Sequence, residues 1–127
     1  MPLDHVALFV PHSSFTSILA WYDDALAPLG YKRKDFIPDQ LIGMSCDGLT
    51  YDFWIHRKDE TARPPVHFAF KAKDRAMVQA FWDQGIKAGG EGNGEPGIRS
   101  MYHEHYFAAY VKDPCGNSIE VVVQTPE

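Results

Sequence analysis

The sequence predicts an α+β fold made of two copies of one module, each running strand, helix and then three strands. Two observations predict it. The order of strand-like and helix-like segments in the first half of the chain returns in the second half, and several residues return with it at nearly constant offsets. A repeat of this kind indicates a fold built from equivalent units. We expect one domain over residues 1–127, with module one at about 1–60 and module two at about 61–127.

The first module begins with a strand over residues 3–10, which is rich in β-forming residues and too short for a helix. Ser13 or Ser14 is a candidate N-cap for a helix that Pro28 and Gly30 would end. Apolar residues recur along that helix at Phe15, Ile18, Leu19, Tyr22, Leu26 and Leu29. Three short strands should follow it, at 31–36, 40–46 and 50–56.

The second module repeats this order after a polar linker over residues 57–64. A strand over 66–70 comes first, and Asp74 is the candidate N-cap of a second helix that Gly89 and Gly90 would end. The apolar face of that helix consists of Val78, Phe81, Trp82 and Ile86. The three strands of this module are expected at about 98–102, 106–112 and 117–124.

Turn residues predict three loops between these elements. Asp47-Gly48 is typical of a tight hairpin between the third and fourth strands. Residues 89–97 hold five of the ten glycines and predict a mobile loop. The run Asp113-Pro114-Cys115-Gly116-Asn117 predicts the turn before the last strand.

The repeat is visible in individual residues. His5 aligns with His67 at an offset of 62, and Asp52 aligns with Glu120 at an offset of 68. Gly30 aligns with Gly90 at an offset of 60. The offset changes from one pair to the next because surface loops can differ in length between the two modules.

Side chains alternate across a strand, so the repeated residues can be assigned to faces. One face of the first and last strands is apolar throughout and should pack under the helices, with Val6, Leu8 and Val10 on one strand and Ile119, Val121 and Val123 on the other. His5, His67 and Glu120 belong to the opposite faces. The repeat symmetry directs them toward one concave surface.

Two histidines and a carboxylate that converge on a cavity form a metal site with open positions for a substrate. These ligand types suit a divalent ion of iron, manganese, zinc, nickel or cobalt. A carboxylate within an apolar strand, as at Glu120, needs a partner of this kind. Asp52, the equivalent of Glu120 in module one, is either a fourth ligand, a base beside the metal or a surface residue.

A second group of chemically useful residues follows the glycine-rich stretch, where a substrate lid would lie. We expect Arg99, Tyr102 and Tyr106 to bind substrate and His103 to serve as a base if Asp52 is a ligand. The alternative is a solvated loop with aromatic anchors. Trp54, which shares a strand face with Asp52, is expected to form one wall of the pocket.

Composition excludes several classes of protein. The chain has 127 residues, a mass of 14.3 kDa and a net charge of -5, which disfavours nucleic acid as a partner. No apolar run approaches the ~20 residues of a membrane span, and we expect a cytoplasmic protein without a secretory signal. Cys46 and Cys115 have no metal-binding spacing and suggest a reducing compartment. Because the apolar residues exceed what two short helices can hide, we expect a homodimer.

Leu3-Asp4-His5-Val6, the two βαβββ units and the run from Asp113 to Glu120 together resemble the vicinal oxygen chelate superfamily. This group contains glyoxalase I, bleomycin resistance proteins and extradiol dioxygenases. The resemblance covers nearly the whole chain and is greatest to the small glyoxalase-like proteins. It implies two curved, mixed sheets around a metal-binding cleft, with His5, His67 and Glu120 where the ligands of the family lie.

The resemblance implies chemistry in which a metal binds vicinal oxygens of a small molecule and stabilises an anionic intermediate. The first hypothesis is a metal-dependent lyase, isomerase or dioxygenase. The alternative is a metal-free binding protein of the bleomycin resistance type, with Trp54, Tyr102 and Tyr106 stacking on the ligand. A third possibility is an interaction domain that has lost the site. Small glyoxalase I enzymes carry Glu where Asp52 stands, and no arginine matches those that hold glutathione.

Overall fold

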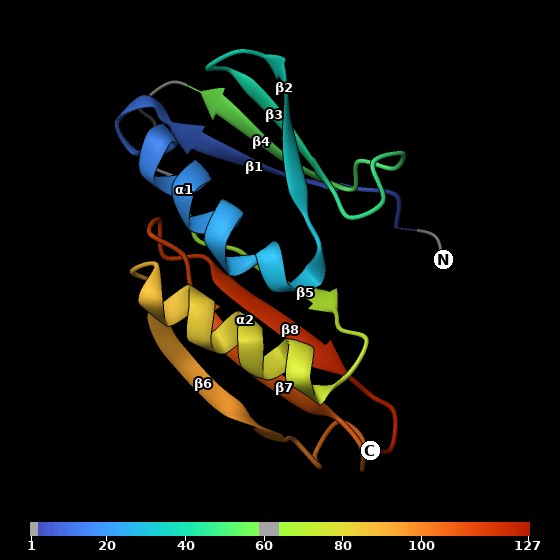
Figure 1. Cartoon of the computed structure of the whole chain (residues 1–127). Coiled ribbons are helices and arrows are strands. Elements are labelled where there is room, and N and C mark those ends of the chain that lie inside the picture. Colours follow the sequence, from blue (N-terminus) through green and yellow to red (C-terminus); the bar gives the residue numbers. More distant parts are fainter. Residues whose placement is uncertain (1–2, 59–63) are drawn as a thin grey trace.

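The computed structural model describes residues 3–58 and 64–127 and has the α+β architecture that the sequence predicts. Two four-stranded mixed sheets carry one helix each, and the sheets do not close into a barrel. Figure 1 shows the two sheets arranged one above the other, with both helices on the same side of them. The repeated order of one strand, one helix and three strands is therefore confirmed.

The first sheet contains β1 (Val6–Pro11), β2 (Lys32–Ile37), β3 (Leu41–Ser45) and β4 (Phe53–Lys58). The second contains β5 (His67–Lys71), β6 (Glu91–Ile98), β7 (Phe107–Lys112) and β8 (Ser118–Val123). Their strand orders are equivalent, β1-β4-β3-β2 and β5-β8-β7-β6. The first strand of each module pairs in parallel with the last strand of that module, and the other pairings are antiparallel. Both β1 and β5 are edge strands.

The two helices begin where the sequence predicts, but they are capped differently. Helix α2 (Arg75–Lys87) has Asp74 as its N-cap, whose carboxylate accepts a hydrogen bond from the Met77 N–H at 2.9 Å. Helix α1 (Phe15–Ala25) follows a 3-10 turn, η1 (His12–Ser14), and Ser14 makes no side-chain cap. The chain after α1 tightens into η2 (Ala27–Leu29) and ends at Gly30 in the left-handed region. The proline at the start of η2 lacks an N–H, which explains why the helix stops before the apolar stripe does.

The expectation of a mobile loop over residues 89–97 is wrong, and so is the strand expected at 98–102. Residues 91–98 form β6, which pairs with β7, and residues 99–106 form the connecting turn. The register of β6 shifts twice, near Gly94. Ladder hydrogen bonds come from the backbone, so a glycine-rich segment can pair without any alternation of side chains.

The predicted tight hairpin at Asp47-Gly48 is also wrong. Residues 46–52 separate β3 from β4, and the Asp47 carboxylate accepts hydrogen bonds from the N–H groups of Leu49 and Thr50 at 2.8 and 2.7 Å. These bonds lower the pKa of Asp47 to about 2. The aspartate thus shapes a longer loop from its side chain. Of the expected linker over 57–64, the first two residues belong to β4, and residues 59–63 lie outside the described residues.

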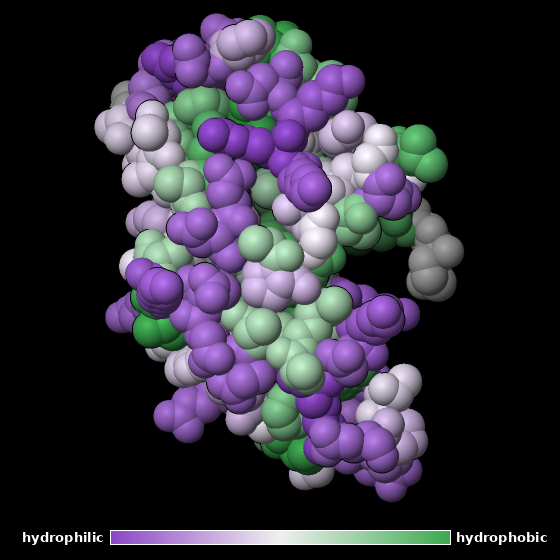
Figure 2. All heavy atoms as spheres, in the orientation of Figure 1, coloured by the Kyte–Doolittle hydropathy of each residue, from purple (hydrophilic) through white to green (hydrophobic). Residues whose placement is uncertain are grey.

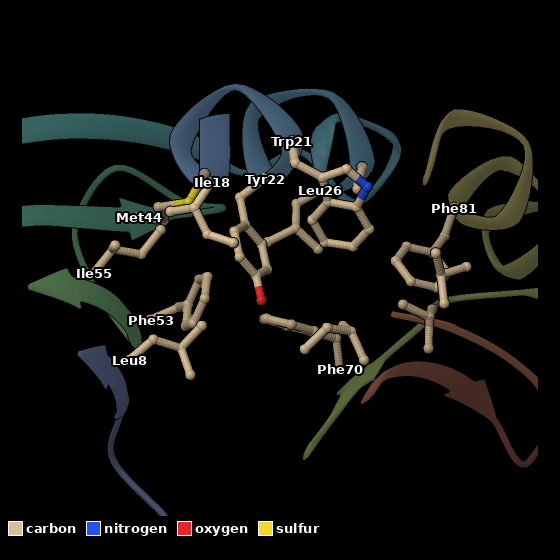
Figure 3. Close-up of a cluster of buried hydrophobic side chains, with 14 of the residues drawn as sticks. Leu8, Ile18, Trp21, Tyr22, Leu26, Met44, Phe53, Ile55, Phe70 and Phe81 are labelled. Atoms are coloured by element: carbon tan, nitrogen blue, oxygen red, sulfur yellow. The ribbon is translucent and has the colours of Figure 1, made fainter. Parts of the chain in front are cut away.

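The two modules share one hydrophobic core beneath their helices. Figure 3 shows Tyr22 extending from α1 between Phe53 and Phe70, which belong to different sheets. The Tyr22 hydroxyl donates to the Asp113 carboxylate at 2.6 Å, so a helix of module one is bonded to the last turn of module two. The Trp21 Nε1–H donates to the carbonyl of Gly85 in α2 at 3.0 Å. Buried Tyr and Trp usually find such partners, and here both partners lie across the module boundary.

The assignment of strand faces agrees with the sequence. Residues of the apolar face are buried at Leu8, Val10, Ile119, Val121 and Val123. Hydrophilic residues cover much of the helix-bearing surface of the molecule (Figure 2). No helix among the described residues is long and apolar enough to cross a membrane.

Candidate functional site

The structure brings His67 and Glu120 into direct contact. His67 is the first residue of β5, and Glu120 lies in β8 opposite Ala69, the next residue on the His67 face. The imidazole Nε2 is 3.1 Å from the carboxylate Oε1. Glu120 is 3% exposed, whereas half of the His67 side chain reaches solvent. A buried carboxylate therefore has an accessible imidazole as its neighbour.

Both groups of this pair are held by further hydrogen bonds. The Nδ1 of His67 is 2.9 Å from the carbonyl oxygen of Ser118 and 3.2 Å from the Ser118 hydroxyl. The carbonyl is the nearer partner and can only accept, so we assign the proton to this nitrogen. The second oxygen of Glu120 accepts a hydrogen bond from the Tyr106 hydroxyl. Burial, followed by the neighbouring carboxylate, raises the pKa of Tyr106, which keeps the phenol protonated and able to donate.

The tautomer that Ser118 imposes directs the lone pair of Nε2 toward a carboxylate oxygen. Two such electron pairs at 3.1 Å repel each other unless a cation lies between them, either a proton or a metal ion. Ligand atoms that lie about 2.0–2.2 Å from one ion are about 3 Å apart at octahedral angles and about 3.4 Å apart at tetrahedral angles. A carbonyl bond to Nδ1 is the usual outer support of a metal-binding histidine. The donor atoms of His67 and Glu120 therefore fit a divalent metal.

His5 and Asp52 form a second, more open pair in module one. Each directly precedes a strand, His5 before β1 and Asp52 before β4, and both line a cavity of about 400 Å³. The two Asp52 oxygens accept hydrogen bonds from the Tyr31 hydroxyl at 2.9 and 3.0 Å. His5 is bonded through Nδ1 to the neighbouring Asp4 at 2.7 Å. Burial and the bond to Asp52 raise the pKa of Tyr31, so the phenol also remains a donor.

The structure brings together two of the three expected ligands, His67 and Glu120, and places His5 apart from them, beside Asp52. Within residues 3–58 and 64–127, no three or more His, Cys, Asp or Glu side chains come together as a potential metal site. The strands that carry the pairs nevertheless face each other. The cavity beside His5 is also lined by residues 68–71 of module two, and a second cavity of about 510 Å³ lies between β1 residues and Val66.

An aromatic wall adjoins the His5 pair. Trp54, Tyr51 and Phe36 contact one another with ring centroids 4.9–6.0 Å apart, over the first sheet. Trp54 and Tyr51 line a third cavity, of about 420 Å³, together with His5. Trp54 therefore lies beside a candidate ligand, as the sequence suggests for a pocket wall.

Of the predicted site residues in and beside the turn between β6 and β7, some lie near the His67–Glu120 pair and others do not. Tyr106 reaches Glu120, and the ring of Tyr102 packs on Tyr106 with centroids 5.1 Å apart while remaining largely exposed. Arg99 lies over the ring of Tyr110 on β7. His103 instead accepts a bond from the His105 N–H at 3.1 Å. No contact within the described part of the chain joins His103 to the His67–Glu120 pair or to the His5–Asp52 pair.

Three tyrosines of the site were not predicted from the sequence, namely Tyr31, Tyr51 and Tyr110. Tyr110 is paired in register with Glu120, and its ring stacks on that of His67 at 6.0 Å. Alternation along β7 could have identified it, since it lies on the Glu120 face. Tyr31 gave no such signal, because its partner Asp52 is distant in sequence and belongs to another strand-loop junction.

The chain belongs to the Glyoxalase/Bleomycin resistance protein/Dioxygenase superfamily, whose pattern it matches over residues 3–121. No curated relative matches it. Solved structures with the same fold include a glyoxalase/bleomycin resistance protein from Albidiferax ferrireducens T118. That protein is 22% identical, with a TM-score of 0.73 and coverage of 94% of this chain and 97% of the other.

Two further structures are similar at lower identity. A glyoxalase/bleomycin resistance protein/dioxygenase family enzyme from Burkholderia phytofirmans PsJN is 16% identical, with a TM-score of 0.73 and coverage of 98% and 100%. A lactoylglutathione lyase from Agrobacterium tumefaciens is 19% identical, with a TM-score of 0.65 and coverage of 97% and 96%. At these identities the likeness shows the fold.

Proposed function

We propose that this protein is a metal-dependent enzyme of the glyoxalase-like type that acts on a small oxygenated molecule. The observation that supports the proposal is the pair of opposed lone pairs on His67 and Glu120, between which either a proton or a metal ion can lie. His5 would supply the third ligand. Imidazole and carboxylate ligands suit zinc, nickel, iron, manganese or cobalt.

The proposed chemistry assigns separate tasks to the residues of the two pairs. A divalent ion, when bound, supplies Lewis-acid polarisation of adjacent oxygens in the substrate. Tyr106 holds the Glu120 carboxylate in place, and Asp52 accepts the proton that the substrate loses. Tyr31 donates to Asp52 and keeps that carboxylate oriented. Trp54 excludes water from one side of the pocket.

The reaction class is proposed as a lyase, isomerase or dioxygenase reaction. The lactoylglutathione lyase among the similar structures supports the first. Asp52 is one methylene shorter than the glutamate of small glyoxalase I enzymes, so a substrate other than the glutathione adduct is favoured. A metal-free binding protein is the second candidate, and the aromatic wall of Phe36, Tyr51 and Trp54 supports it.

We propose further that the two pairs meet within one chain. The cavity that His5 lines also includes Ala69, the neighbour of His67 on the same face of β5, and this supports closure across the two edge strands. Refolding a mixture of His5→Ala and Glu120→Gln proteins tests it. The mixture should bind no more metal than either variant does, whereas a return of metal would show that copies share their sites.

A homodimer in the cytoplasm is part of the same proposal. Apolar side chains remain exposed on the chain, among them Leu3, Phe9 and Ile37, and both cysteines are free. Sedimentation at micromolar concentration should give twice the 14.3 kDa of one chain. A species of 14.3 kDa alone would contradict the dimer.

Elemental analysis of protein purified without chelators or a metal-affinity tag tests the central proposal. The wild type should carry about one ion per chain, and Glu120→Gln should lose it, because the amide keeps the shape but not the charge. Glu104→Gln is the matched control, since Glu104 is an exposed glutamate in the β6–β7 turn. Equal metal content in the wild type and Glu120→Gln would refute the proposed site.

A further inference from the structure

The side chain of Arg99 packs over two glycines of β6, Gly94 and Gly97. Its side chain turns back along β6 so that Nη2 would be 3.2 Å from a Cβ at Gly94, and Nη1 would be 3.1 Å from a Cβ at Gly97. Both distances are shorter than ordinary van der Waals contacts. A Cβ at either position would therefore crowd the guanidinium, which uses the space that the two glycines leave.

This position is on the same face as the His67–Glu120 pair. Tyr110 of β7 is paired with Gly94 on one side and with Glu120 on the other, which places the three in one row across the sheet. The Arg99 Cζ is 5.3 Å from the centroid of the Tyr110 ring, and that ring stacks on His67. One aromatic ring thus separates the guanidinium from the candidate metal ligands.

The guanidinium has unused capacity to bind an anion. It has five N–H donors, and the one hydrogen bond that it forms with the described residues runs from Nη2 to the carbonyl of Glu95, at 2.7 Å. Within the same residues it forms no ion pair. Arg33 and Arg75 differ, since Arg33 pairs with Asp23 and Arg75 pairs with Glu127. Arg57 likewise forms no ion pair within the described residues, but it bonds to the Asp39 carbonyl and to His12.

The fold of the neighbouring turn does not require this side chain. Backbone hydrogen bonds close the turn, from the Arg99 N–H to the Tyr106 carbonyl at 2.8 Å and from the Tyr102 N–H to the Arg99 carbonyl at 3.1 Å. Any residue at position 99 could make them. At Gly97 the open space accommodates mainly the guanidinium, whereas at Gly94 it also accommodates the ring of Tyr110, whose Cδ1 would be 2.7 Å from a Cβ.

We propose that Arg99 binds a carboxylate of the substrate, so that the substrate is a small organic acid. Arginine suits this task because its planar fork can donate two parallel hydrogen bonds to a carboxylate. The carboxylate would lie over β6, and the reacting oxygens would lie beyond Tyr110 toward His67. Gly97 is a specificity-determining residue, because a side chain there would displace the guanidinium. The location of the reacting oxygens rests on the proposed function; the carboxylate site does not.

Acid and amide probes of matched shape test the proposal: acetate and acetamide, benzoate and benzamide, succinate and succinamide. Binding is followed by NMR shifts of the backbone amides and of the Arg99 Nε–H. The protein is used as purified and again after metal removal by a chelator, which excludes binding of the acid by the metal. At least one acid should bind about tenfold more tightly than its amide in both forms, the strength of a charge-assisted hydrogen-bond pair.

Three variants test whether Arg99 causes the preference for acids over amides. Arg99→Gln should abolish it, and Gly97→Ala should weaken acid binding several-fold while keeping every charge, since the added Cβ would meet only Arg99 Nη1 and, at 3.9 Å, the Glu95 carbonyl. Arg33→Gln, a surface control, should retain it. Absence of a preference for any acid, or a preference that survives in Arg99→Gln, would overturn the proposal. A protein that selects acids but binds no metal would refute only the proposed function, and a metalloprotein without acid preference would refute only this inference.

Discussion

The two modules place equivalent residues at equivalent points but hold them to different degrees. In module two, His67 and Glu120 lie within paired strands, and Ser118 and Tyr106 fix their orientation. In module one, His5 and Asp52 lie just outside the strands, where pairing starts one residue later at Val6 and Phe53. The comparison teaches that module two holds its histidine and carboxylate in direct contact around a buried Glu120, whereas module one bonds His5 and Asp52 to separate neighbours beside an open cavity.

Each module uses a tyrosine hydroxyl to bind its carboxylate, although the two tyrosines are not equivalent in the repeat. Tyr106 precedes β7, whereas Tyr31 precedes β2, the strand that corresponds to β6. The same interaction therefore arises from two different places in the module. A carboxylate that faces a pocket needs a donor to fix its orientation, and the two halves obtain one independently.

The largest expected effect separates the roles of the two carboxylates. Asp52→Asn should lower turnover of a substrate identified with metal-loaded protein by about 100- to 10,000-fold, because the amide cannot accept a proton. Its metal content should remain that of the wild type, in contrast to Glu120→Gln. Parallel loss of metal and turnover in Asp52→Asn would make Asp52 a ligand, and loss of neither would make it a surface residue.

The tyrosines should differ in a graded way. Tyr106→Phe removes the donor to Glu120 and should weaken metal binding about tenfold, as expected for an outer partner of a ligand. Tyr31→Phe, its counterpart, should leave metal affinity within about twofold because its partner Asp52 is proposed as the base. Competition with a colorimetric chelator measures both. Equal effects would remove the distinction between the two halves.

The junction between the modules should respond through stability. Tyr22→Phe deletes the buried hydrogen bond to Asp113 and should lower the free energy of unfolding by about 1–3 kcal/mol. Denaturant unfolding measures the change. Tyr102→Phe, at an exposed tyrosine, should change it by no more than about 0.5 kcal/mol. If Tyr22→Phe and Tyr102→Phe have the same free energy of unfolding, the hydrogen bond from Tyr22 to Asp113 does not stabilise the junction between the modules.

The smallest effect is expected at Asp47, in the loop between β3 and β4 of module one. The corresponding loop of module two has a different shape. Hydrogen bonds lower the pKa of Asp47 to about 2 in the folded protein, from an ordinary value of 3.8. Its contribution is therefore complete above about pH 4 and is lost as the pH falls toward 2, because the unfolded chain takes up the proton first. Asp47→Asn should show a shallower loss of stability across this interval in acid unfolding. Identical slopes would show that the loop bonds contribute nothing.

The sequence predicted the parts of the fold that depend on side-chain periodicity. The buried faces of β1 and β8 and the stripe of α1 follow from alternation and helical spacing. The same alternation assigned His67 and Glu120 to the opposite faces, where the two side chains are in contact. Strand β6 was missed because its glycines carry no side chains to alternate. The packing of Arg99 over Gly94 and Gly97 was missed for the same reason.

Contacts between residues distant in sequence were the other limit. The bond from Tyr31 to Asp52 joins residues 21 positions apart, and no local pattern encodes it. The separation of His5 from the His67 pair likewise depends on the angle between two sheets. Repeat symmetry gives the faces on which residues lie, but it does not give the distance across the module boundary.

The most direct test of the two-half site is the metal content and Co(II) affinity of His5→Ala, set beside His67→Ala. If both modules hold one ion, each variant should bind Co(II) at least about tenfold more weakly than the wild type, and the wild type should bind one ion per chain. His12→Ala, an imidazole outside both pairs, is the matched control and should bind as the wild type does. Wild-type affinity in His5→Ala would contradict the shared site and leave module two as the whole of any metal centre.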